Sequence, residues 1–158
     1  MEVCCADNWQ KYENYTQQFK RLKRALSSEF YLEAVFIAYA IMEDRTEAVL
    51  RHAGMWEAYM KSRKNSMPTI NSKVKLIQRV AENRTDLLHR YFADALLADI
   101  LQWKEQRNTL IHALLKQQLT TAQLKELAEQ GSDLAKTLRN RTTAHKRAAE
   151  KQKAKEQA

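Results

Sequence analysis

The sequence predicts an all-α fold, a helical bundle of four to six helices, and three observations support this prediction. With two glycines and one proline in 158 residues, the chain has little material for hairpin turns. The alternation of apolar and polar residues that is typical of a half-buried strand is absent. Instead, long runs carry an apolar residue at every third or fourth position, which is the period of an α-helix. The length suits one domain with a modest core.

The first part of the chain contains two predicted helices. An Asp-Asn pair is a suitable N-cap for a helix over about residues 9–26. Two serines then precede a second helix over residues 30–52, in which positions 34–42 are apolar on nearly all sides. A helix of this kind is expected at the centre of a bundle or an oligomer. Gly54 is well placed to end it in the left-handed conformation.

The middle of the chain is less regular. Residues 55–60 fit either a turn of helix or a loop, whereas the basic segment 61–68 is typical of an exposed loop. A third helix is predicted over residues 72–82, where apolar positions recur at helical spacing.

The second half contains the helix that carries the candidate site. A helical segment over residues 87–92 is either separate from this helix or continuous with it, and the helix itself extends to about residue 118. A threonine at 120 or 121 is a suitable cap for a short helix that ends at Gly131, and Ser132 is a suitable cap for the last one.

The C-terminal segment differs in composition from the rest. From residue 139 onward large apolar residues are absent and Arg, Lys, Ala, Glu and Gln remain, so we expect a bundle over residues 1–138 and a basic tail, helical or disordered, over residues 139–158. The net charge is +8, and residues 136–158 carry +6 of it. Such a tail either guides RNA through phosphate contacts or serves only for solubility.

Cysteine usage predicts a reducing compartment. Cys4 and Cys5 are adjacent, and no other thiol is present to pair with them. With no apolar signal segment after Met1, we expect a cytoplasmic protein; lipidation of the cysteine pair is the alternative. No run is long and apolar enough for a membrane span, so no membrane partner is expected.

The candidate site is the sequence Arg107-Asn108-Thr109-Leu110-Ile111-His112. Arg107 projects from the middle of the broad apolar face of its predicted helix, with Asn108 beside it and His112 at the edge of that face. A buried guanidinium without a partner costs several kcal/mol, so Arg107 requires a buried acid or a polar cleft. Glu43 and Asp44 are possible acids, although both also suit ordinary helix-end charges.

The spacing of Arg107 and His112 is not informative by itself, because every histidine in the chain has an arginine at a similar distance. The other pairs are Arg45 with His52, Arg84 with His89, and Arg139 with His145. Arg45 is expected to pair with Glu43 or Glu47. The second pair straddles a helix start, and the third lies in a charged tail without an apolar face. Only Arg107 and His112 interrupt a strongly amphipathic helix.

Arg107-x4-His112, with a polar residue directly after the arginine and a place on a late helix, resembles the Arg-x(4–6)-His motif of the HEPN family. The resemblance covers this one helix and the helical architecture. It implies a HEPN-like bundle and a metal-independent endoribonuclease of toxin or phage-defence type, in which two protomers form one composite cleft. The partners it implies are RNA, a second copy of the chain, and a separate antitoxin or regulatory protein.

The residues suit this chemistry, which needs a base for the 2′-OH, stabilisation of the phosphorane, and an acid for the 5′-oxygen. His112 can exchange a proton near neutral pH, and Arg107 can hold phosphorane oxygens with its planar fork. Asn108 can orient His112 or bind a phosphate or base. No cofactor or metal site is expected, since the histidines are scattered and the cysteines lack a second pair.

Two rival hypotheses stay open. In one, a non-catalytic helical module of the same fold binds RNA or a protein partner and Arg107 is structural; in the other, the chain is only an oligomerisation bundle. One departure from the family also matters. Some HEPN toxins carry a tyrosine two residues after the histidine, and this chain has Leu114 there, which puts control through that tyrosine in doubt.

Overall fold

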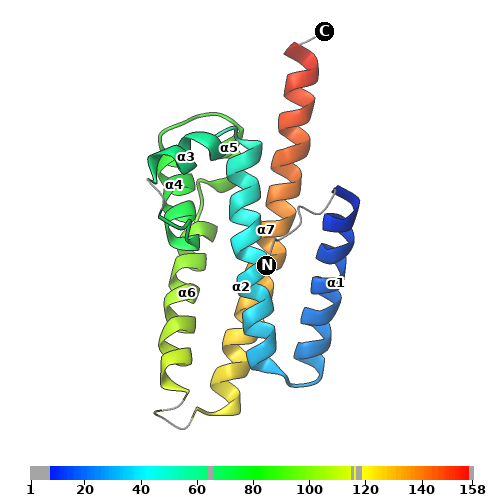
Figure 1. The fold of residues 1–158 in the computed structure, drawn as a ribbon, viewed down its shortest axis with the longest axis vertical. Coiled ribbons are helices and arrows are strands. Elements are labelled where there is room, and N and C mark those ends of the chain that lie inside the picture. The colour runs from blue at the N-terminus through cyan, green and yellow to red at the C-terminus, as the bar shows by residue number, and fades with distance from the viewer. Residues whose placement is uncertain (1–7, 64–65, 115, 117–118, 157–158) are drawn as a thin grey trace.

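The protein is all-α. The computed structural model describes residues 8–63, 66–114, 116 and 119–156, which contain seven helices and no strand (Figure 1). The helices are α1 (Asn8–Ser27), α2 (Tyr31–His52), α3 (Trp56–Ser62), α4 (Ile70–Glu82), α5 (Leu87–Phe92), α6 (Leu96–Ala113) and α7 (Thr121–Glu156). The predicted class is confirmed. The predicted number of four to six helices was too low: the two short segments that the sequence left open, α3 and α5, are both separate helices, whereas α7 replaces two predicted ones. No helix in the described part of the chain has the length and apolar character that crossing a membrane requires.

Helix α2 is central, as its sequence predicts. It packs most extensively on α7 and also contacts α1, α3 and α4. Ala34, Val35 and Ala38 are fully buried, and Met42 follows them into the core. Gly54 ends the helix with a φ of +69°, and the amide of Met55 donates to the carbonyl of Leu50 at 2.8 Å, which completes the left-handed helix end expected from the sequence.

The remaining helices surround the α2–α7 pair. Figure 1 shows α1 on one side of this pair and α6 on the other, with α3, α4 and α5 grouped at one end. Helix α4 begins two residues earlier than predicted, because Thr69 and Ser72 form a reciprocal capping box. Helix α5 is separate from α6. Its N-cap Asp86 accepts from the amide of Leu88, and the side chain of Asp94 accepts from the amide of Leu96.

Helix α7 is one continuous helix of 36 residues, not the two helices predicted. Of the two predicted caps, Thr120 and Thr121, the structure selects Thr120, since its hydroxyl accepts from the amide of Gln123. The predicted end at Gly131 is wrong, because Gly131 is buried inside the helix against the indole of Trp103. The absence of a side chain there serves the close approach of α6 and does not end the helix.

The segment beyond residue 138 continues α7. Thr142 and His145 are buried in it, although the sequence predicts no core contacts after residue 139. The prediction depended on apolar residues as the sign of a buried position, but here the buried side chains are a threonine and a histidine. Residues 150–156 are exposed along their whole length.

Candidate functional site

Arg107 extends from α6 to two aromatic side chains of α2. Its guanidinium carbon lies 4.6 Å from the ring centroid of Tyr39 and 5.1 Å from that of Phe36. Its Nη1 donates to Oδ1 of Asn108 at 3.1 Å, whereas its buried Nε has no hydrogen-bond partner within the described residues. The two ring faces therefore support a cation that the sequence expects to need an acid or a polar cleft.

The position of Arg107 follows from the packing of α6. Leu97, Ile100 and Trp103 are buried, and the indole Nε1 of Trp103 donates to the carbonyl of Leu127 on α7 at 2.8 Å. Arg107 comes one turn after Trp103 on nearly the same face of the helix. This places its side chain at the edge of the core, beside α2.

The electrostatic environment of Tyr39 contains charges of both signs. Burial raises the pKa of the Tyr39 phenol, and nearby Glu43 raises it further, whereas Arg107 and Lys104 lower it. Glu43 is already engaged by Lys73, whose buried ammonium donates to the Glu43 carbonyl at 3.0 Å and lies 3.7 Å from its carboxylate. Arg107 forms no ion pair in the described part of the chain, so its charge is not neutralised by an acid.

The acids considered from the sequence have other partners. The Asp44 carboxylate accepts from Nε of Arg45 at 3.0 Å. Arg45 therefore pairs with its neighbour and not with Glu43 or Glu47, and its guanidinium lies 3.9 Å from the ring centroid of Tyr15. The sequence did not indicate this arrangement, because the ring belongs to a different helix.

His112 lies in the last turn of α6 and is exposed. It follows Arg107 by five positions, which corresponds to about 7.5 Å along the helix and about 140° around it. The two side chains of one protomer consequently leave α6 in different directions. Asn108 accepts from Arg107, and no hydrogen bond joins it to His112 in the described structure.

The Arg139–His145 pair shares one feature with the candidate site. Arg139 donates to its neighbour Asn140 and lies 4.5 Å from the ring centroid of Phe19, as Arg107 lies over Tyr39. His145 is 2% exposed, so unlike His112 it cannot meet a substrate in this conformation. The prediction that this pair has no fixed surroundings was wrong for both residues.

In the two other Arg–His pairs, the side chains contact neighbouring residues of the fold. Arg84 forms an ion pair with Asp86 at 2.9 Å, and Nδ1 of His89 lies 2.8 Å from the carbonyl of Ala81. His52 is half-buried, and its pKa is lowered by burial first and then by nearby positive groups, among them Lys146.

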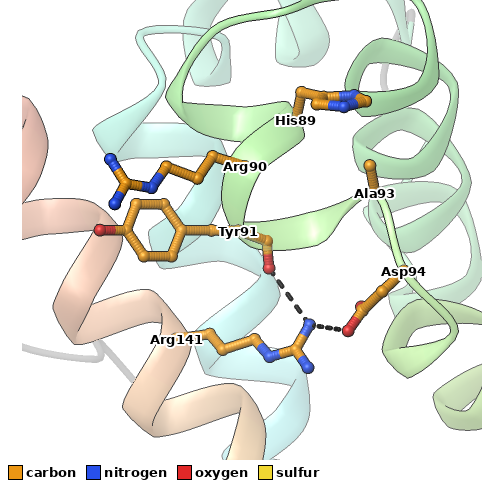
Figure 2. Close-up of a pocket in the computed structure, with 6 residues that line it drawn as sticks. All are labelled: His89, Arg90, Tyr91, Ala93, Asp94 and Arg141. Atoms are coloured by element: carbon orange, nitrogen blue, oxygen red, sulfur yellow. Dashed lines mark hydrogen bonds and ion pairs between the residues drawn. The ribbon is translucent and has the colours of Figure 1, made fainter.

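A surface pocket of about 410 Å³ lies where α5 meets α7. Figure 2 shows Arg141 reaching from α7 to Asp94, with 2.5 Å between Nη1 and the carboxylate, and to the carbonyl of Tyr91 at 3.3 Å. Burial by itself raises the pKa of Asp94. The hydrogen bonds from Arg141 and from the amide of Leu96, together with the positive charge of Arg141, have the larger effect, so the pKa of Asp94 is lowered. The pocket thus contains a clamp between α7 and the α5–α6 connection.

The sequence did not predict this clamp, because it assigned Arg141 to the tail. No group of three or more His, Cys, Asp or Glu side chains in the described ranges could hold a metal ion. Cys4 and Cys5 lie outside those ranges.

Compared with known proteins, the chain matches no family model, no curated protein and no solved structure. The resemblance to HEPN domains that the sequence suggests therefore stays an expectation, based on Arg107, Asn108 and His112.

Proposed function

We propose that the protein is a metal-independent endoribonuclease of toxin or phage-defence type, with a composite site formed by two copies of the chain. The proposal assigns Arg107 and His112 to catalysis and Asn108 to the support of Arg107. HEPN-like identity, RNA as the substrate and a cytoplasmic location are parts of the same proposal.

The observation that carries it is the state of Arg107. Its guanidinium is held in a defined orientation by Phe36, Tyr39 and Asn108, yet no acid within the described residues neutralises it. Its Nε is buried without an acceptor, and an unsatisfied buried donor costs about 1–3 kcal/mol. A phosphate oxygen supplied by a substrate would accept from the terminal nitrogens of this oriented guanidinium, which carry its charge outward from the buried Nε.

The reaction follows from the two side chains. A histidine acting as base removes the 2′-OH proton, and O2′ attacks the phosphorus. Arg107 stabilises the added negative charge of the five-coordinate phosphorane. The bond between phosphorus and O5′ then breaks, and a second, protonated histidine gives its proton to O5′. The products are a 2′,3′-cyclic phosphate and a free 5′-hydroxyl, and no oxidant or cofactor is consumed.

Two copies are needed because one chain supplies one His112, and this residue diverges from Arg107 around α6. The face beside Arg107 suits self-association. Phe36 is 47% exposed next to a groove between α1 and α2, and Leu32, Ile37 and Ala40 also line this groove. Around a two-fold axis the same patch would meet itself and bring two sets of site residues to one groove.

The test is RNA cleavage by the purified full-length chain in the presence of a chelator. We expect products that end in 2′,3′-cyclic phosphate, and we expect His112→Ala to abolish them while thermal unfolding is unchanged. His89→Ala is the matched control, because His89 lies on the separate helix α5: cleavage should persist in it even if the loss of its contact with the Ala81 carbonyl lowers thermal stability. Cleavage that persists in His112→Ala would exclude the catalytic assignment, and a strictly monomeric active protein would exclude the composite site.

One observation favours the second candidate, a non-catalytic module that binds RNA or a protein. Arg139, like Arg107, donates to the asparagine that follows it and lies over an aromatic ring, and the histidine paired with it in the sequence, His145, is buried. Such an arrangement therefore also occurs where it has a structural role. RNA binding without cleavage by the unaltered dimer would support this candidate.

A further inference from the structure

We propose that residues 146–156 of α7, the basic arm, bind the phosphate backbone of RNA outside the Arg107–His112 site. The choice of RNA as the polyanion rests on the proposed function. The existence of a binding surface rests on the shape and charge of the arm itself.

The basic arm projects from the bundle. Helix α7 has 36 residues, whereas α2, the next longest described helix, has 22. At about 1.5 Å per residue, α7 is about 20 Å longer than α2. Figure 1 shows its C-terminal end extending beyond every other helix, and His145 is the last buried residue before it. The arm is thus accessible from several sides.

The charge of the basic arm is largely unneutralised. It contains five cations, Lys146, Arg147, Lys151, Lys153 and Lys155, against Glu150 and Glu156. Lys146 lies 3.7 Å from Glu150 in an exposed pair, and the other four cations form no ion pair in the described structure. Like charges held on one helix repel one another, so a bound polyanion would relieve this repulsion.

The cations also form a regular row. Arg147, Lys151 and Lys155 follow one another at intervals of four residues, which places them along one side of the helix with about 6 Å of rise between neighbours. A row of evenly spaced cations on a rigid helix suits a chain of evenly spaced phosphates.

Other partners fit less well. The apolar residues of the basic arm are Ala148, Ala149 and Ala154, so it lacks the large side chains through which a partner helix would pack. It likewise lacks the Trp, Phe or Leu residues with which an amphipathic helix enters a membrane surface. A polyanion recognised through its charge is the partner that remains.

The test compares two triple variants of the full-length chain, both carrying His112→Ala so that the RNA is not cut. The arm variant carries Arg147→Gln, Lys151→Gln and Lys155→Gln. The control carries Lys20→Gln, Lys23→Gln and Arg24→Gln, which removes three exposed cations from α1. Glutamine retains helix propensity, so circular dichroism should be unchanged in both.

Binding of a fluorescently labelled single-stranded RNA is measured by anisotropy over a range of salt concentrations. We expect the arm variant to bind at least about tenfold more weakly at low salt, and the slope of log K against log salt to decrease in magnitude by about 2. The α1 control should keep the slope of its parent.

An arm variant that binds like its parent, or a control that loses as much as the arm variant, would overturn the proposal. Arm-dependent binding to vesicles of anionic phospholipid without binding to RNA would overturn it as well. The proposed function can fail separately. If the native chain binds RNA through the basic arm but never cuts it, the nuclease proposal is contradicted and the proposal that the basic arm binds RNA stands.

Discussion

Gly131 of α7 lies against the indole of Trp103 of α6. A Cβ atom built on Gly131 would come within 2.8 Å of Cε2 of Trp103, and the indole Nε1 donates to the carbonyl of Leu127 one turn earlier on α7. The pair fixes the separation and the rotation of the two helices. Because Arg107 follows Trp103 by one turn, the same contact determines where the guanidinium meets α2.

We expect Gly131→Ala to lower the free energy of unfolding by up to about 2 kcal/mol. Alanine in place of glycine inside a helix contributes about 1 kcal/mol of stability, but the added methyl group must displace a buried ring, and such overpacking costs about 1–3 kcal/mol. Urea unfolding measures the difference. Ser132→Ala is the neighbouring control: its buried hydroxyl has no described partner, so its loss should be neutral or stabilising. A Gly131→Ala variant more stable than the native chain would contradict the packing argument.

We expect Arg107→Lys to reduce kcat for RNA cleavage by about a hundredfold with little change in RNA affinity. Lysine keeps the charge but lacks the planar fork that would hold two phosphorane oxygens. Single-turnover cleavage and anisotropy separate the two effects. Arg139→Lys is a close control, since that arginine likewise donates to the asparagine that follows it and lies over an aromatic ring, that of Phe19. Equal losses in the two variants would point to a structural role for both arginines.

The helices were predictable because their residues carry local information. The apolar period, the cap at Thr120 and the end at Gly54 depend on interactions within a few residues of each position. Gly131 shows the limit of this approach. A glycine can either end a helix or leave space for a bulky side chain of a neighbouring helix. At Gly131 the second role applies because of Trp103, which is 28 positions earlier in the chain.

The candidate site was predictable only in part for the same reason. The sequence places Arg107 on an apolar face, but its ring partners Phe36 and Tyr39 belong to a helix that is apolar on nearly all sides, where no residue stands out. Arg141 and His145 were assigned to a tail because the composition changes there. Their partners Asp94 and Tyr91 precede α6 in the sequence, about 50 residues earlier, as the Arg141–Tyr91 separation shows. Contacts between distant segments leave no local pattern.

We expect the free energy of unfolding to decrease as the pH falls below about 6.5, the ordinary histidine value. Burial lowers the pKa of His145, with a smaller opposing effect of Asp86, and burial also lowers the pKa of His52. In this range the unfolded chain binds more protons than the folded one, so stability is complete above the ordinary value and is lost below it.

Urea unfolding at neutral and mildly acidic pH tests this dependence. His145→Phe should reduce it, because phenylalanine does not titrate and can pack against Tyr91 and Phe92, which contact the imidazole edge-on. The pKa of Asp94 is lowered, so protonation of this residue reduces the free energy of unfolding only in more acidic solution, below about pH 4. A variant with the pH dependence of the native chain would show that His145 is not responsible.

The role of the C-terminal part of α7 can be tested with two truncations. Removing residues 150–158 deletes only exposed positions among those described, so we expect the free energy of unfolding to change by less than about 0.5 kcal/mol. Removing residues 139–158 deletes buried Thr142 and His145 and the Arg141 clamp on Asp94, and should cost at least about 2 kcal/mol. Equal stability of the two truncated chains would place the end of the bundle at residue 138, as the composition suggests. A loss confined to the longer deletion would place it after His145, where α7 leaves the core and the basic arm begins.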